Sequence, residues 1–149
     1  MEIYWLGHGC FRLKGRDATV ITDPTAPTTG YKIGKLPANI VTISRDKPEY
    51  NYLQAIQGEP KVLTAPGEYE IAGVLITAVR TEREPAGGKN RNVAFVMDID
   101  DVRICHLGDI SEVPHNDDAE ALSAADVLLI PVGGGSVFNA QKAAETVSM

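Results

Sequence analysis

The sequence has little of what several classes of protein require. It contains two cysteines, Cys10 and Cys105, which are too few for a disulfide framework and are typical of a protein with reduced thiols. No apolar run approaches the roughly 18 residues that a membrane helix needs. The first ten residues, MEIYWLGHGC, contain neither the basic nor the apolar segment of a secretion signal. We therefore expect a cytoplasmic protein with no membrane partner.

An excess of basic residues is also missing. The chain has 14 Lys and Arg against 20 Asp and Glu, which gives a formal net charge of −6 and a pI of about 5.0. This balance disfavours nucleic acid as a partner, although a local cationic site can still form on an acidic protein. The 149 residues, of which 44% are hydrophobic and 23% charged, are typical of one globular domain, residues 1–149.

What the chain does contain is a series of short strand patterns followed by alternating strands and helices. Pro48 suits the first turn of a helix that Gly58 ends, and Asn139 is expected to cap a last helix over 140–147. A further helix is expected over 117–124. This order favours an α/β or α+β fold in which helices cover sheets. Strands are expected over 2–6, 10–13, 19–22, 40–44, 61–64, 69–71, 74–81, 93–98, 102–107 and 126–132.

Six segments, in chain order, carry a resemblance to a known family. They are WLGHGCF, ITDP, the strand, loop and helix over 40–57, PGEYEIAGV, RICHLGD and DVLLIPVGG. With these segments the chain resembles the metallo-β-lactamase superfamily, specifically the metal-dependent hydrolases similar to L-ascorbate-6-phosphate lactonase. The resemblance implies a four-layer αββα sandwich with two Zn or Mn ions at one edge. It also implies a C-terminally truncated domain, without the family's final strand–helix region and last ligand histidine.

The loop TISRDKPEYNY, residues 42–52, has the outline of a loop that grips a ligand, yet it contains no histidine or cysteine. The resemblance aligns it with the family motif His-x-His-x-Asp-His. Arg45, Lys47 and Tyr50 stand at the three histidine positions and Glu49 at the aspartate position. Arginine cannot ligate a metal, lysine and tyrosine are poor ligands at neutral pH, and cations repel Zn²⁺. We therefore expect no metal cofactor and no hydrolysis by the family mechanism.

The same resemblance implies that Arg83 matches the next ligand histidine and that Asp109, in LGD, matches the bridging aspartate. Arg45, Lys47 and Arg83 would then lie where two metal ions balance the carboxylates of the family site. Two alternatives follow, a salt-bridge network that keeps the loop folded or a pocket for a small anionic ligand such as a phosphate or carboxylate. Asp23, a carboxylate that orients the loop in the family, is expected to pair with Arg45 or Lys47.

Two further patterns are less specific. The resemblance places His8 near the metal centre, as a polar site residue. His8, Cys10, Cys105 and His106 could also form a structural zinc site, but adjacent residues of a strand point to opposite faces, which disfavours it. The glycine-rich segment 133–136 follows a strand, where phosphates can bind, but it lacks the P-loop lysine.

Two functions of different classes remain from the sequence. The first is a non-catalytic binding or interaction module, a pseudoenzyme of its family. The alternative is a metal-dependent hydrolase of lactonase or phosphoesterase type, with a partial or partner-completed site around Asp109, His8 and Glu49. Because a missing strand would leave an unpaired sheet edge, we also expect self-association into a homo-oligomer.

Overall fold

A computed structural model describes residues 1–82 and 91–149. Its helices are α1 (Asn116–Leu122) and α2 (Ala140–Val147), with two 3-10 turns, η1 (Pro27–Thr29) and η2 (Leu53–Ala55). Its strands are β1 (Glu2–Gly7), β2 (Cys10–Lys14), β3 (Thr19–Thr22), β4 (Leu36–Pro37), β5 (Ile40–Thr42), β6 (Ile56–Gln57), β7 (Lys61–Leu63), β8 (Gly67–Ile71), β9 (Val74–Arg80), β10 (Val93–Ile99), β11 (Val102–His106) and β12 (Val127–Leu129).

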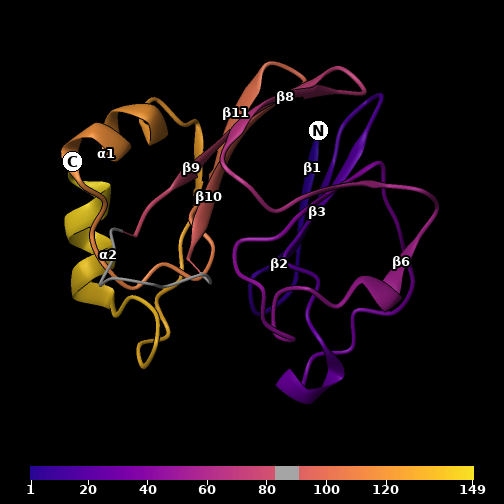
Figure 1. Cartoon of the computed structure of the whole chain (residues 1–149), viewed down its shortest axis with the longest axis horizontal. Coiled ribbons are helices and arrows are strands. Elements are labelled where there is room, and N and C mark those ends of the chain that lie inside the picture. The colour runs from indigo at the N-terminus through magenta and orange to yellow at the C-terminus, as the bar shows by residue number, and fades with distance from the viewer. Residues whose placement is uncertain (83–90) are drawn as a thin grey trace.

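Two five-stranded sheets form the body of the molecule (Figure 1). The first sheet has the order β1-β2-β3-β5-β7 and the second the order β12-β11-β10-β9-β8, while β4 and β6 form a separate parallel pair. In each sheet antiparallel hairpins are extended by parallel strands, namely β5 and β7 in the first and β12 in the second. This mixed α/β sandwich confirms the predicted fold class.

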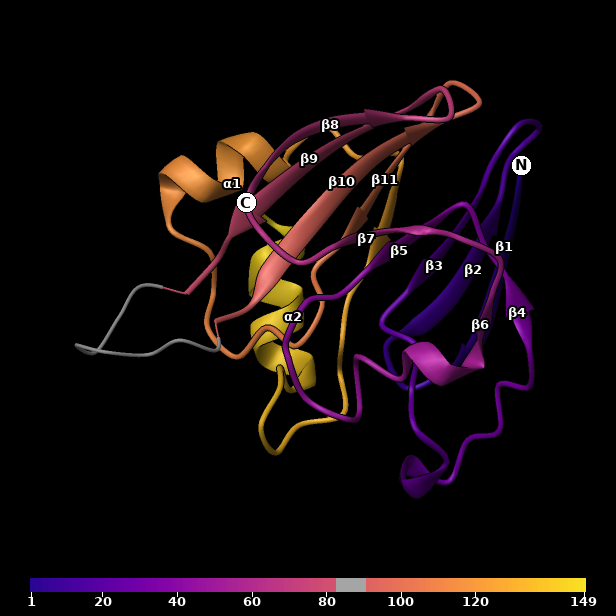
Figure 2. The same ribbon diagram turned by 45° about the vertical axis from the view of Figure 1, so that its right-hand side comes forward.

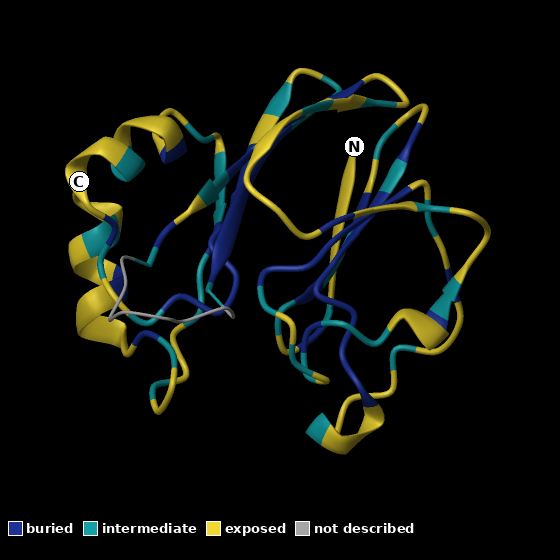
Figure 3. Ribbon diagram, in the orientation of Figure 1, coloured by how far each residue is buried: buried dark blue, intermediate teal, exposed yellow. Residues whose placement is uncertain are grey.

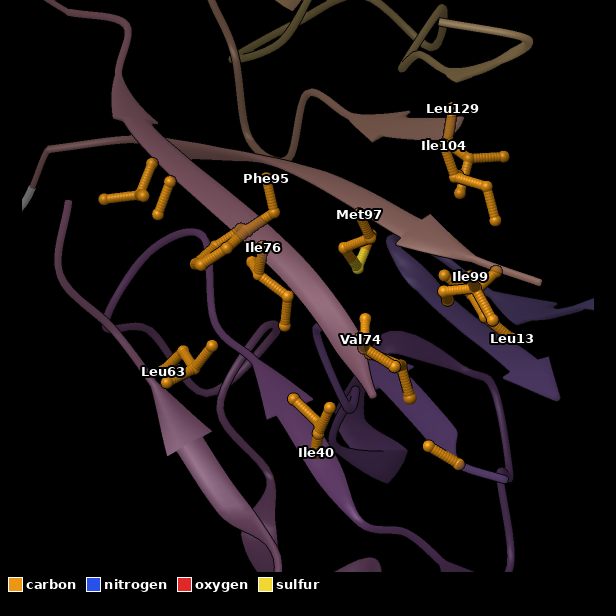
Figure 4. Packing of buried hydrophobic residues seen from close by; sticks show 14 residues of the cluster. Leu13, Ile40, Leu63, Val74, Ile76, Phe95, Met97, Ile99, Ile104 and Leu129 are labelled. Carbon is orange, nitrogen blue, oxygen red and sulfur yellow. The ribbon is translucent and has the colours of Figure 1, made fainter. Parts of the chain in front are cut away.

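The main core lies between the facing surfaces of the two sheets, as Figure 4 shows. Alternation along β9 explains how one strand contributes to it, since Val74 and Ile76 are buried while Leu75 between them is 52% exposed. Strand β10 is buried on both faces and is dark blue along nearly all its length in Figure 3. Side chains that meet in this core include Leu13, Ile40, Leu63, Ile76, Phe95, Met97 and Ile104.

Helices α1 and α2 cover the outer face of the second sheet (Figure 2). Leu122 of α1 and Ala143 of α2 pack with Val96 and Cys105 from the sheet, so Cys105 is a core residue. Asn139 caps α2 as predicted, because its side chain accepts a hydrogen bond from the backbone N–H of Lys142. No helix among the described residues is long and apolar enough to cross a membrane.

The outer face of the first sheet has a different cover, and here the predicted helix over 48–57 is wrong. These residues form turns, η2 and β6, and the cluster around Ile21 and Val41 is covered by the β4–β6 pair and its loops. Tertiary bonds override the helical pattern. The Tyr52 N–H donates to the Pro24 carbonyl, and the Pro48 carbonyl accepts from Ala26.

Two neighbouring residues of β9 test whether the core lies between the sheets. Ile76→Ala opens a cavity between the sheets and should lower the free energy of unfolding by about 2–5 kcal/mol. Leu75→Ala removes a similar volume from a half-exposed position and should change it by only about 0.5 kcal/mol. Urea denaturation of both variants measures the difference. Equal losses would mean that the core does not lie between these faces.

Candidate functional site

The candidate site is centred on Asp109, directly after β11 at one edge of the second sheet. Asp109 is only 2% exposed. The preceding Gly108 has a φ of +66°, and a Cβ there would lie 2.2 Å from the Cβ of Ser44. Glycine therefore allows the chain to turn against the first sheet. The Asp109 N–H donates to Oδ1 of Asn92 (2.8 Å) and more weakly to Oγ of Ser44 (3.3 Å).

Three side chains from the loop after β5 converge on the Asp109 carboxylate. Nε of Arg45 lies 2.6 Å from Oδ2, and Nζ of Lys47 lies 3.5 Å from the same oxygen. The Tyr50 hydroxyl donates to Oδ1 at 2.6 Å, and burial together with this bond raises the pKa of Tyr50. These are the three residues that the sequence aligns with the family's histidines. Their charge and hydrogen-bonding capacity is directed at Asp109 itself.

A second carboxylate, that of Glu82, also contacts Arg45. Nη2 of Arg45 donates to Glu82 Oε1 and also to the Asp109 carbonyl at 3.2 Å. Glu82 in turn accepts from the Ser111 hydroxyl (3.1 Å) and from the Asn92 N–H (3.3 Å). The predicted site residue Arg83 lies outside the described residues. The cluster formed by Arg45, Lys47, Tyr50, Glu82 and Asp109 is called the Asp109 cluster below.

Asp23 does not pair with Arg45 or Lys47, so that expectation is wrong. It is fully buried after β3 and accepts two hydrogen bonds from Ser44, from the N–H at 2.6 Å and from the hydroxyl at 2.7 Å. Ser44 belongs to the loop over 42–52 and directly precedes Arg45. Asp23 thus orients the loop through Ser44. Burial raises the pKa of Asp23 to about 8 against the effect of the Ser44 bonds, and the charge of Asp109 adds to the rise.

His8 and Glu49 are not part of the hydrogen-bonded cluster. His8 is exposed, with a φ of +53°, and its ring lies 4.9 Å from that of Tyr50. Glu49 is half-buried, and no described residue hydrogen-bonds or ion-pairs with it. The structure thus brings three of the predicted loop residues into contact with Asp109, whereas in the described part of the chain no hydrogen bond or ion pair joins these two catalytic candidates to its carboxylate.

A pocket of about 610 Å³ borders the Asp109 cluster on the Tyr50 side. It lies between the β1–β2 turn and the segment that follows β12, which includes Gly133 and Gly134. His106 lines it as well, although that residue is only 3% exposed. Burial lowers the pKa of His106 to about 4, so its imidazole is neutral near pH 7.

The donor set around Asp109 does not fit a two-metal centre. Arginine and ammonium groups offer no lone pair to a metal, and the Tyr50 phenol keeps its proton because its pKa is raised. Among residues 1–82 and 91–149, no group of three or more His, Cys, Asp and Glu side chains is arranged to hold a metal ion. A divalent cation at Asp109 would have to displace Arg45 from a contact of 2.6 Å.

Sequence reasoning missed three residues that support the site. Ser44 bridges Asp23 and Asp109, Asn92 holds the Asp109 N–H, and Glu82 neutralises Arg45. Asn92 offers a signal in retrospect, because it is a fully buried amide beside the apolar strand β10. Its side chain donates to Thr81 and to the Leu107 carbonyl, so it joins three segments at one point.

Comparison with known proteins finds one family and several relatives that match essentially the whole chain. The family described as Beta-lactamase superfamily domain matches residues 2–149. A UPF0173 protein of Pyrococcus furiosus is 28% identical over 170 residues, which cover 100% of this chain and 78% of that protein. A UPF0173 metal-dependent hydrolase of Methanoculleus marisnigri is 28% identical over 163 residues, 90% of this chain and 69% of that protein.

Solved structures agree with this match. A metallo-β-lactamase superfamily protein from Thermotoga maritima superposes with a TM-score of 0.82 at 32% identity, over 98% of this chain and 69% of that chain. A metallo hydrolase from Ignicoccus hospitalis gives a TM-score of 0.67 at 15% identity, over 97% of this chain and 76% of that chain. The second likeness shows the fold alone.

The ion pairs of the Asp109 cluster predict that loss of the Asp109 charge strongly lowers the free energy of unfolding. Asp109→Asn keeps the shape of the side chain but leaves Arg45 beside a neutral amide, so the free energy of unfolding should fall by about 3 kcal/mol. The control Asp101→Asn changes an exposed residue whose φ of +64° asparagine tolerates, and should stay within about 0.5 kcal/mol. Urea denaturation compares them, and an Asp109→Asn variant as stable as the control would contradict the pairing.

The raised pKa of Asp23 predicts a pH dependence. The folded state keeps the Asp23 proton up to about pH 8, whereas the unfolded chain releases it near pH 4. Stability therefore falls as pH rises between these values, by up to about 1.4 kcal/mol per pH unit. The lowered pKa of His106 acts in the opposite direction, but only between about pH 4 and 6.5.

Among the described groups whose pKa is clearly shifted, Asp23 is thus the one that acts between about pH 6.5 and 8. Unfolding free energies measured across this window should decline for the natural chain and for Asp101→Asn, and should stay level for Asp23→Asn. A decline that persists in Asp23→Asn would assign the pH dependence to another group.

Proposed function

The chain belongs to the beta-lactamase superfamily domain family, which matches residues 2–149, and from that premise we propose that it is a non-catalytic member that acts as a binding or interaction module. One observation carries the proposal. Arg45, Lys47 and Tyr50 contact the Asp109 carboxylate directly, at 2.6, 3.5 and 2.6 Å. The carboxylate that the resemblance assigns to a bridging role is therefore neutralised from within the chain.

This pairing occupies the carboxylate that the family mechanism would use to hold metal ions. Hydrolysis by that mechanism requires metal ions that lower the pKa of a bound water. Here, binding of a cation at Asp109 would cost the Arg45 ion pair, and Arg45 and Lys47 would repel the incoming charge. The protein's own cations take over the electrostatic role of the metal, so the fold is retained without the chemistry.

The alternative is a metal-dependent hydrolase with a partial or partner-completed site. The name of the Methanoculleus marisnigri relative favours it, since that protein is called a metal-dependent hydrolase. In this alternative Asp109, His8 and Glu49 would contribute, and further ligands would come from another chain. Self-association, expected from the sequence, would be a requirement of this alternative, and analytical ultracentrifugation tests it.

Metal content separates the two proposals. Chelator-treated protein is incubated with excess Zn²⁺ or Mn²⁺, desalted and measured by inductively coupled plasma mass spectrometry. We expect less than about 0.1 metal per chain, because the ammonium and guanidinium groups at the site offer no lone pair. Hydrolysis of a lactone and of a phosphoester is assayed on the same samples, and neither should exceed the buffer rate.

The positive control rebuilds the missing ligands in the same chain. The variant R45H/K47H/E49D/Y50H carries the motif His-x-His-x-Asp-His and should retain metal after desalting. Stoichiometric metal or turnover in the natural chain would contradict the non-catalytic function and support the metal-dependent hydrolase.

A further inference from the structure

We propose that the pocket between the β1–β2 turn and the segment after β12 is a preformed site for a small, uncharged, aromatic molecule. The inference rests on the proposed function in one respect, because it names the ligand class that a non-catalytic binding module would take. It concerns the pocket beside the Asp109 cluster and leaves the cluster itself intact.

The lining of the pocket determines the class of ligand. None of the described residues that line it is an aspartate, glutamate, lysine or arginine. Its volume of about 610 Å³ lies within the range of small-molecule pockets, about 300–1,000 Å³. The cations of the site, Arg45 and Lys47, are held against Asp109 and do not line it. An anionic ligand would therefore lose its hydration in the pocket without gaining an ionic partner.

Aromatic rings form one part of the wall, aliphatic side chains and glycines from the segment around and after β12 form another, and contacts with their neighbours hold the rings in place. Nε1 of Trp5 donates to the His8 carbonyl at 2.9 Å, and Tyr31 packs edge-on against the Trp5 ring with centroids 5.8 Å apart. The Tyr50 hydroxyl is bound to Asp109. Phe11 meets the His106 ring edge-on, with centroids 6.0 Å apart. These side chains need little reordering on binding, which favours affinity for a flat ring.

Two apolar side chains that line the pocket are exposed to water. Trp5 is 60% exposed and Val132, on the opposite side of the pocket, is 58% exposed. Covering both with one ligand would remove apolar area from water on two sides of a ring. Polar side chains are few among the described lining residues, and the exposed ones belong to His8 and Ser136. A ligand that also carries one neutral polar group suits this lining.

Phenol, benzoate and inorganic phosphate test the ligand class on the metal-free natural chain. Trp5 is the single tryptophan, so its indole N–H gives one assignable signal in a ¹H–¹⁵N NMR spectrum. We expect phenol to shift this signal in a saturable way, and benzoate and phosphate to leave it unchanged. Saturation by benzoate or phosphate at an affinity equal to that of phenol would overturn the proposal and favour an anion site.

Matched variants locate the binding. Val132→Asp should weaken phenol binding about tenfold, because a charge beside the ring must lose water. Val147→Asp, a substitution of a similarly exposed valine on α2 outside the pocket, should leave the affinity unchanged. Equal effects of the two variants, or no saturation by phenol, would overturn the inference.

Metal content measured on the same samples keeps the two proposals apart. Stoichiometric metal together with phenol binding that Val132→Asp weakens would contradict the non-catalytic function and support the pocket. Metal-free protein that does not bind phenol would contradict the pocket alone.

Discussion

The pairing of Asp109 is the interaction on which the candidate site depends. Its carboxylate is almost completely removed from water, and a charge in that position must be paired or neutralised. Arg45, Lys47 and Tyr50 do this from a single loop. Because the loop follows β5 in the first sheet and Asp109 follows β11 in the second, the same contacts join the two sheets at one edge of the sandwich.

The supporting residues show how the fold accommodates this cluster. Ser44 connects Asp23 of the first sheet to Asp109, and Asn92 connects the start of β10 to the end of β11. Gly108 allows the close approach, since any side chain there would collide with Ser44. Removal of any one of these polar groups leaves another buried without a partner, so they act as one network.

The pairing also has a consequence for recognition. Arg45 and Lys47 pair with carboxylates of the Asp109 cluster and do not line the adjoining pocket. In the described part of the chain, the adjoining pocket is therefore lined mainly by aromatic and aliphatic side chains, backbone and the neutral imidazole of His106.

Sequence patterns predicted the regular parts of the molecule because their causes are local. Alternating burial along β9, the hairpin between β10 and β11 and the Asn139 cap of α2 all follow from neighbouring residues. The helix expected over 48–57 failed because Tyr50 and Tyr52 bond to distant groups. The sequence by itself determined the order of the strands along the chain and, through its resemblance to the family, predicted that Arg45, Lys47 and Tyr50 stand at the histidine positions of the loop. Only the tertiary structure decided that these side chains meet Asp109, about sixty positions away, because packing of the two sheets closes that distance.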